Sequence, residues 1–269
     1  MTDANLPVSG LIPDSITQEV NRHFSQSART YRQGAQLQFE VGEALLERLQ
    51  PNGKSVCLDL GCGPGLFSLP LKQAFSQLVS LDLSVNMLQA NVEAGTRVQG
   101  DCHALPICGN SIDAVYSSLM VQWCDLPKVL KEIHRVLQVG GQAVISTLIQ
   151  GSLFELEAAW QTVDSDTHIH DYLSLAQVEA SLDEKDWADV RIDTVTHTYW
   201  FDRATSLAKE LKLLGANFVK RRERKGLTPK SNWLAMEAAY REKFYNKSRV
   251  GIPASYRVVY LNLTKSERV

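Results

Sequence analysis

The stretch Val56–Gly65 constrains the fold of this chain more than any other. Apolar residues at 56, 58 and 60 form a short run typical of a strand buried in a sheet. Glycines at 61, 63 and 65 follow, and they allow a tight turn with positive φ and let a ligand lie against the backbone. The apolar spacing of residues 67–75 then predicts a helix, whose first amides would point at that ligand.

The spacing of the glycines separates two classes of cofactor. A dinucleotide fold uses G-x-G-x-x-G and places a pyrophosphate at the helix N-terminus. This chain has G-x-G-x-G, with Asp59 two residues before the first glycine. A carboxylate there would repel a pyrophosphate but attract a cationic ammonium or sulfonium, as in S-adenosylmethionine (SAM). The string Asp59-Leu60-Gly61-Cys62-Gly63-Pro64-Gly65 resembles motif I of the class I SAM-dependent methyltransferases.

Composition narrows the class of protein further. The 269 residues, 44% hydrophobic and 22% charged, are ordinary for a globular protein with a sizeable core. A net charge of −2 gives no general attraction to nucleic acid or anionic membrane, and no apolar run is long enough for a membrane helix. The five cysteines contain no C-x-x-C pair, which favours reduced thiols in a cytoplasmic protein with no metal site and no disulfide framework.

Strand and helix patterns alternate five times through residue 148, with later strands expected at 78–83, 97–101, 112–117 and 143–148. This predicts an α/β, doubly wound parallel sheet with helices on both faces. Further strands are expected at 190–201 and 255–263, with helices at 153–163, 204–214 and 233–245. The resemblance implies a Rossmann-like sheet of seven mostly parallel strands, the last one antiparallel. We divide the chain into an N-terminal helical lid (1–50), a SAM-binding core (51–201), a helical cap over the substrate (202–250) and a closing strand (251–269).

Acidic residues follow the second and third strands, where ligands of open α/β sheets bind. Asp82 suits the ribose hydroxyls of an adenosine, although it could instead cap the next helix together with Ser84. Asp101 could hold the adenine amino group while the next backbone amide meets the ring, or it could be a turn aspartate. Ser117 and Ser118 end the fourth strand, and the stretch 117–123 would lie over the transferable methyl group. The predicted cofactor-binding residues are Asp59, Gly61, Cys62, Gly63, Gly65, Asp82, Leu83, Asp101, Cys102 and Ser117.

A more specific resemblance covers residues 20–263. Its signatures are Val121-Gln122-Trp123-Cys124, the run 146–153, Ala159-Trp160, Trp200-Phe201, Gly215-Ala216-Asn217 and, near the N-terminus, Phe24, Ala28 and Tyr31. They are similar to the malonyl-[acyl-carrier protein] O-methyltransferases of biotin synthesis. The resemblance implies that SAM methylates the free carboxylate of a malonyl thioester on acyl carrier protein, and that the methyl ester starts pimeloyl and biotin synthesis. One departure is His170-Asp171-Tyr172, where the family pattern has Asn-Arg-Phe, so the arginine that would suit a carboxylate is lost.

The implied chemistry needs no general base, because a carboxylate is already ionised at pH 7. Tyr31 and Gln122 are therefore predicted as catalytic residues that act as neutral donors and orient the carboxylate. From the residues alone, Tyr31 fits a surface tyrosine in a helix break better than a lid over the cofactor. Trp123 is expected to fill the core, with a platform for the substrate as the alternative. His168 and His170 are expected to lie on a polar loop rather than on a metal.

One dense basic run stands out, formed by Lys220, Arg221, Arg222, Arg224 and Lys225. It is either a solvated surface or a dock for an acidic carrier protein. Three other functions stay open: a SAM methyltransferase for another small molecule or RNA, a non-catalytic SAM-binding protein, and a dinucleotide oxidoreductase. The sequence also leaves open the oligomeric state and whether the thioester is on a carrier protein or coenzyme A.

Overall fold

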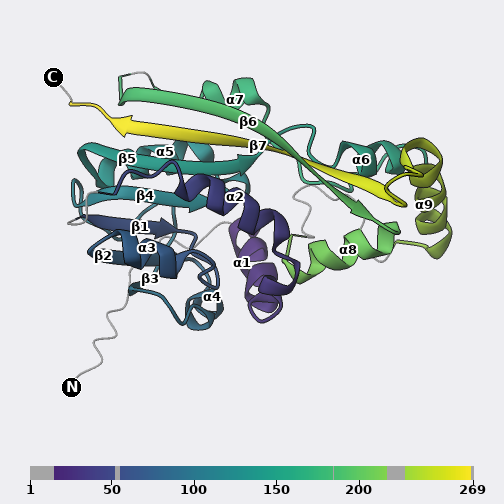
Figure 1. The fold of residues 1–269 in the computed structure, drawn as a ribbon, viewed down its shortest axis with the longest axis horizontal. Coiled ribbons are helices and arrows are strands. Elements are labelled where there is room, and N and C mark those ends of the chain that lie inside the picture. The colour runs from purple at the N-terminus through teal and green to yellow at the C-terminus, as the bar shows by residue number, and fades with distance from the viewer. Residues whose placement is uncertain (1–14, 52–54, 184, 217–227, 268–269) are drawn as a thin grey trace.

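The computed structural model describes residues 15–51, 55–183, 185–216 and 228–267, and its centre is one seven-stranded sheet (Figure 1). The strand order is β3-β2-β1-β4-β5-β7-β6. All neighbouring pairs are parallel except those of β7, which runs antiparallel to both β5 and β6. The predicted α/β fold is therefore confirmed. The strands are β1 (Val56–Leu60), β2 (Gln77–Asp82), β3 (Thr96–Gln99), β4 (Ile112–Ser118), β5 (Leu137–Leu148), β6 (Trp187–Phe201) and β7 (Ile252–Lys265).

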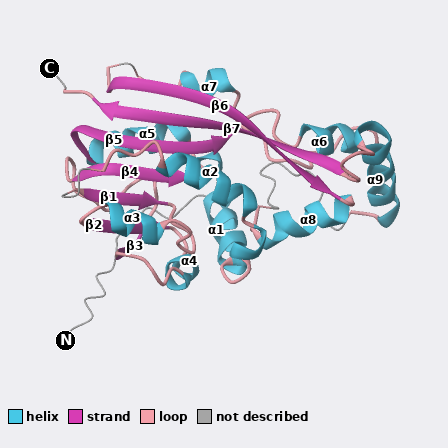
Figure 2. Cartoon of the chain, in the orientation of Figure 1, coloured by secondary structure: helices cyan, strands magenta, loops and turns pink. Residues whose placement is uncertain are grey.

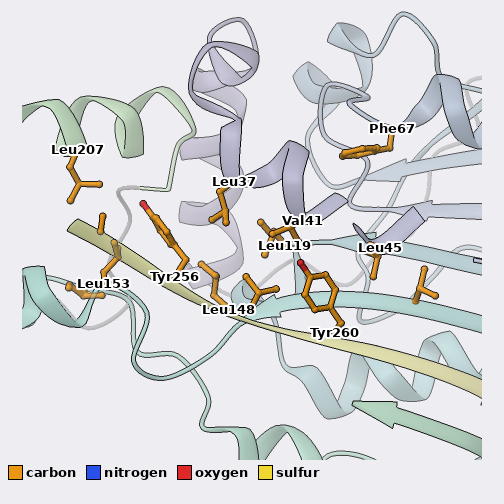
Figure 3. Close-up of a cluster of buried hydrophobic side chains, with 14 of the residues drawn as sticks. Leu37, Val41, Leu45, Phe67, Leu119, Leu148, Leu153, Leu207, Tyr256 and Tyr260 are labelled. Carbon is orange, nitrogen blue, oxygen red and sulfur yellow. The ribbon is translucent and has the colours of Figure 1, made fainter. Parts of the chain in front are cut away.

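Helices cover both faces of the sheet (Figure 2). On one face α2 (Gln36–Leu46) and α3 (Ser68–Ala74) pack on strand residues such as Tyr116 and Tyr260, and Figure 3 shows part of this cluster. On the other face α5 (Leu126–Val136) and α7 (Leu175–Glu179) pack on their strand neighbours. Because successive strand residues point to opposite faces, each buried strand supplies both clusters.

Two features differ from the sequence-based expectation. Strand β5 begins at Leu137, immediately after α5, rather than at residue 143. Gly140 lies inside this strand with φ +74°, where the pairing with β4 is irregular. Helix α7 was not expected. Its sequence signal is a capping box: the Ser174 hydroxyl accepts the backbone N–H of Gln177, and the Gln177 side-chain oxygen accepts the backbone N–H of Ser174.

Strands β6 and β7 continue past the ends of the other strands, and helices gather around this extension (Figure 1). They are α6 (Phe154–Trp160), α8 (Ala204–Leu213) and α9 (Lys230–Phe244). From the opposite end of the chain, α1 (Ser15–Ser27) and the 3-10 helix η1 (Tyr31–Gly34) reach the same region, where the Thr30 hydroxyl donates to the Leu213 carbonyl at 3.0 Å. None of the helices in the described ranges is long and apolar enough to cross a membrane.

Candidate functional site

The glycine turn lies at the carboxyl end of β1, and all three of its glycines have positive φ, at +71°, +52° and +76°. A Cβ on Gly61 would lie 2.3 Å from the Met120 side chain, and one on Gly65 would lie 2.0 Å from Asn91 Oδ1. A Cβ on Gly63, by contrast, would meet no heavy atom within 4 Å outside the neighbouring residues of the chain. Close packing therefore explains the first and third glycines, whereas the second borders open space where a ligand can approach the backbone.

Asp82 at the end of β2 stabilises this turn through hydrogen bonds to backbone amides. Its carboxylate accepts the Gly63 amide at 2.9 Å and the Ser84 amide at 2.8 Å. Burial raises its pKa, and these hydrogen bonds oppose that rise. Helix α4 (Val85–Ala90) is capped by the Ser84 hydroxyl, so the helix-capping alternative for Asp82 does not apply.

A cavity of about 810 Å³, here called the Asp82 cavity, opens above the turn. It joins Tyr31 and six of the predicted cofactor-binding residues: Gly61, Gly63, Asp82, Leu83, Asp101 and Cys102. Residues of α1, among them Asn21 and Phe24, close it from the N-terminal side, and no sequence pattern had placed them there. The cavity lies outside the carboxyl ends of the strands, as expected for a ligand site of an open α/β sheet.

Asp101 faces the Asp82 cavity as part of a small network that the sequence analysis missed. Its carboxylate accepts the His103 amide at 2.9 Å and the His103 ring Nδ1–H at 2.7 Å. The Asp125 amide donates to His103 Nε2 at 3.0 Å, so the ring proton is on Nδ1. The bond from His103 lowers the pKa of Asp101 and keeps it an ionised acceptor.

A smaller cavity, the Asp59 cavity, adjoins the first and is lined by Asp59, Cys62 and Gln38 together with Tyr31 and the glycine turn. Asp59 is only 4% exposed, and the Ser68 hydroxyl donates to it at 3.3 Å. Burial, with the nearby Asp82 charge adding to it, raises the pKa of Asp59 to about 7. A cation beside Asp59 would relieve this cost of burying a carboxylate.

Ser117 lies outside both cavities, which corrects its predicted position. Its hydroxyl is buried and donates to the Leu60 carbonyl at 2.9 Å. The next residue, Ser118, lines both cavities instead. Because neighbouring residues of a strand point to opposite sides, an error of one position moves a side chain out of the site.

A third cavity lies beside Gln122 and is here called the Gln122 cavity. Gln122 is held at both ends of its amide: Nε2 donates to the Leu119 carbonyl at 2.7 Å, and Oε1 accepts the Thr147 hydroxyl at 3.2 Å. Tyr31 lines this cavity as well as the other two, so the interpretation of it as a surface tyrosine is wrong. Burial raises the pKa of its phenol further, which keeps it a proton donor.

Trp123 also lines the site, contrary to the expectation that it fills the core. It borders the Asp82 and Gln122 cavities and packs edge-on against Phe24, with ring centroids 5.6 Å apart. On its other side lies His170, at 4.7 Å, whose Nε2 donates to the Gln122 carbonyl at 2.9 Å. His170 is thus a packed wall residue rather than a member of a solvated loop.

His168 is likewise packed, stacked on Trp160 at 3.8 Å and bonded through Nε2 to Asp164 at 2.7 Å. Among the described residues, two groups have metal-ligand spacing: Cys102 with His103 and Cys124, and Asp164 with Asp166 and His168. In the first group His103 Nδ1 bonds the Asp101 carboxylate, and in the second His168 Nε2 bonds Asp164, which is itself one of the three.

The N-terminal segment is fastened directly to the glycine turn. The Ser25 and Ser84 hydroxyls lie 2.7 Å apart, and Arg32 donates to the Pro64 carbonyl at 3.0 Å. The first bond joins α1 to the wall of the Asp82 cavity, and the second joins η1 to the wall of the Asp59 cavity. The predicted basic run at 220–225 lies outside the described residues.

Comparisons with known proteins agree with this geometry. A family model described as a methyltransferase domain matches residues 58–145. The chain is 33% identical to malonyl-[acyl-carrier protein] O-methyltransferase of Alcanivorax borkumensis over 98% of this chain and 91% of that protein. It is 36% identical to the protein of the same name from Hamiltonella defensa, over 88% and 90%. It also matches the biotin biosynthesis bifunctional protein BioHC of Cellvibrio japonicus at 35% identity, spanning 91% of this chain and 50% of that longer protein.

Solved structures share the fold. The YcgJ protein from Bacillus subtilis has a TM-score of 0.61 at 16% identity, over 85% of this chain and 99% of that one. Phosphoethanolamine N-methyltransferase 2 of Haemonchus contortus, solved with SAM, has a TM-score of 0.58 at 18% identity, over 96% and 61%. These likenesses confirm the architecture, and the near full-length relatives carry the assignment. The chain therefore belongs to the malonyl-[acyl-carrier protein] O-methyltransferase family of class I SAM-dependent methyltransferases.

Proposed function

We propose that this protein transfers the methyl group of SAM to the free carboxylate of a malonyl thioester carried by acyl carrier protein. The product is the methyl ester that starts pimeloyl and biotin synthesis. The observation that carries the proposal is Tyr31, which lines the Asp82, Asp59 and Gln122 cavities alike. A donor at that junction touches both a cofactor in the first two cavities and an acceptor in the third. The names of the near full-length relatives support the same reaction.

The residues fit SAM on three grounds. The open space at Gly63 admits a ligand against the backbone. Asp82 and Asp101 offer carboxylate oxygens to an adenosine, while Leu83 and Cys102 flank them in the cavity wall. Asp59, buried and adjacent to Cys62, is an acid that a cationic group would keep ionised. When bound, SAM supplies a methyl group on a positively charged sulfur.

The acceptor side needs to orient and desolvate a carboxylate rather than remove a proton. A malonyl carboxyl has a pKa of about 4, so at pH 7 it enters the site as an anion. Tyr31 and Gln122 are neutral donors that orient it without the tight ion pair an arginine would form. In the step itself, a carboxylate oxygen bonds to the methyl carbon, and the carbon–sulfur bond breaks with its electron pair left on sulfur. No proton moves. Apolar walls such as Leu119 and Leu148 exclude water from the two opposite charges that cancel.

We further propose that residues 1–50 act as a lid and residues 202–250 as a cap, with 51–201 and 251–269 forming the sheet core. Supporting contacts are Arg32 to the Pro64 carbonyl and Thr30 to the Leu213 carbonyl, which tie η1 to the turn on one side and to α8 on the other. The run Lys220, Arg221, Arg222, Arg224 and Lys225 is proposed to attract the acidic carrier. Five free cysteines fit a cytoplasmic location.

The test is methyl transfer from labelled SAM to malonyl-carrier protein, with succinyl- and acetyl-carrier proteins as controls. We expect label in the malonyl ester, weak transfer to succinyl and none to acetyl, which lacks the carboxylate. Label appearing on tRNA or a quinone precursor, with none on malonyl-carrier protein, would contradict the proposal.

A further inference from the structure

A further hollow, here called the Trp160 groove, lies against the Gln122 cavity. The two share Tyr172, Leu211 and Ala216 in their walls. The groove runs between α6 and α8, in the region where β6 and β7 extend past the sheet (Figure 1). It therefore continues the acceptor site away from the cofactor, toward the face formed by α6 and α9.

The walls of the groove are mostly apolar and held in place. Trp160 stacks on His168 and meets Trp233 edge-on, with centroids 6.0 Å apart, and the Asp164 carboxylate fixes the imidazole. On the opposite side, Ala204, Ala208 and Leu211 recur at helical spacing on α8, so one side of this helix lines the groove. A groove lined along two helices can hold an extended chain.

The polar groups point to the chemistry of that chain. Among the described residues, the groove is lined by no Asp, Glu, Lys or Arg, but Thr167 and Thr228 contribute hydroxyl-bearing side chains. The Gln122 cavity, by contrast, gathers Tyr31, Gln38 and Glu210. Walls whose described residues include no Asp, Glu, Lys or Arg, and in which two threonines and two histidines can form hydrogen bonds, match a neutral ligand that carries amides.

Backbone strain marks the same path. Leu119, at the junction of the Asp82 and Gln122 cavities, has φ +49°, and Leu153, in the wall of the groove, has φ +58°. Figure 3 shows Leu153, Tyr256, Leu148 and Leu119 along this line. Leucine in the left-handed region costs free energy and is concentrated at ligand sites.

We propose that the Trp160 groove binds the pantetheine arm of the carrier-bound acceptor, with the malonyl group in the Gln122 cavity. The inference rests on the proposed function, because it needs an acceptor on a thioester arm. The arm is a neutral chain with two amides, which matches the walls, and its thioester end leads into the cavity through Tyr172, Leu211 and Ala216.

The test variant is Ala208→Trp, which fills the groove from α8. The control variant is Thr205→Trp, which adds a side chain of the same size on the exposed side of that helix. We expect Ala208→Trp to raise the KM for malonyl-carrier protein at least tenfold. It should leave kcat/KM for malonyl methyl thioester, which has no arm, and the Kd for SAM within twofold. Thr205→Trp should change none of these. Free pantetheine should inhibit wild type competitively against malonyl-carrier protein, and Ala208→Leu, a milder block, should weaken that inhibition.

If Ala208→Trp lost equal activity with both thioesters, or lost none with either, the groove would not be the binding site of the arm. A lower KM for malonyl-coenzyme A than for malonyl-carrier protein would contradict the proposal that the bound arm belongs to the carrier protein. If wild type methylates no malonyl substrate, the proposed function itself fails, which is a different result from a normal wild type with an insensitive Ala208→Trp.

Discussion

The cofactor side and the acceptor side of this molecule are built in opposite ways. The Asp82 cavity is formed largely by one continuous part of the chain, from the glycine turn to Cys124, at the ends of neighbouring parallel strands. The Gln122 cavity draws on η1 and α2, on the segment 119–123, on Tyr172, on α8 and on β7. The cofactor site therefore depends mainly on the backbone geometry of one segment. The acceptor site depends on side chains that are far apart in the sequence and are brought together by the fold.

This difference predicts separable defects. Changes at the turn should weaken SAM binding whatever the acceptor, because the turn lies against the cofactor. Changes at the acceptor cavity should act on the malonyl substrate and leave SAM binding nearly intact. The exception is Tyr31, which lies at the junction, although its hydroxyl should matter mainly to the acceptor.

The largest effect is expected for Gly63→Ala. Its Cβ enters open space that a ligand would occupy, and φ is +52°. We expect SAM affinity to fall about 100-fold, or ~2.7 kcal/mol, because the methyl group enters the ligand's space, and Tm to fall by a few degrees because of the left-handed backbone. Calorimetric titration with SAM measures the first and a thermal melt the second.

Gly65→Ala is the matched control, because its Cβ would lie 2.0 Å from the buried Asn91 Oδ1. This variant should lower Tm by roughly 5 °C or more. Normal SAM affinity in Gly63→Ala would mean that the ligand does not approach the backbone there.

The next largest effect is expected for Tyr31→Phe. Loss of one hydrogen bond to a charged group costs roughly 1.5–3 kcal/mol, so kcat/KM for the malonyl acceptor should fall about 10- to 100-fold. The Kd for SAM should change less than about threefold. Steady-state kinetics and SAM titration are read together, with Tyr199→Phe on β6 as the control. An equal loss of SAM affinity would assign the hydroxyl to the cofactor instead.

A smaller effect is expected from pH, through Asp59. Its pKa of about 7 in the free protein means that it is largely protonated below that value, whereas a cationic ligand favours the ionised form. SAM affinity should therefore rise about tenfold from pH 6 to pH 8, with a proton released on binding. Titrations in buffers of different ionisation enthalpy detect that proton.

The Asp59→Asn variant distinguishes a pH dependence caused by Asp59 from one caused by titration of the amine of SAM. It should bind SAM weakly at every pH and lose most of the dependence. The unliganded variant should also melt higher at pH 8, because a buried ionised carboxylate is removed. Unchanged pH dependence in Asp59→Asn would place the titrating group elsewhere.

The smallest effect is expected at Glu210, the acid that lines the Gln122 cavity. Burial raises its pKa, so it holds its proton to higher pH than an exposed glutamate and then ionises as pH increases. The resulting charge opposes the acceptor carboxylate, and the KM for malonyl-carrier protein should rise about threefold toward high pH. Glu210→Gln should flatten that rise, and Glu242→Gln on α9 should not. A profile that stays the same in Glu210→Gln would exclude this residue.

The fold and much of the cofactor site could be predicted because their signals are local. The glycine turn, Asp82 and Asp101 follow strand ends within one run of the chain, and each lies where a strand–turn–helix pattern puts it. Even there, a one-residue uncertainty at the end of β4 exchanged Ser117 for Ser118.

The acceptor side resisted prediction for a physical reason. Trp123 and His170 are typical core or loop residues by composition, and only tertiary packing makes Trp123 a wall of the Gln122 cavity and His170 a wall of the Trp160 groove. The change from Asn-Arg-Phe to His170-Asp171-Tyr172 could be noticed, yet the sequence did not indicate that Tyr172 lies between the cavity and the groove.

The central claim is that cofactor and acceptor meet at Tyr31. The most direct measurement is a crystal structure of the protein with S-adenosylhomocysteine and malonyl-pantetheine. We predict the malonyl carboxylate within hydrogen-bond distance of the Tyr31 hydroxyl, between the cofactor sulfur and Gln122. A malonyl group bound elsewhere, with Tyr31 contacting neither ligand, would contradict the account.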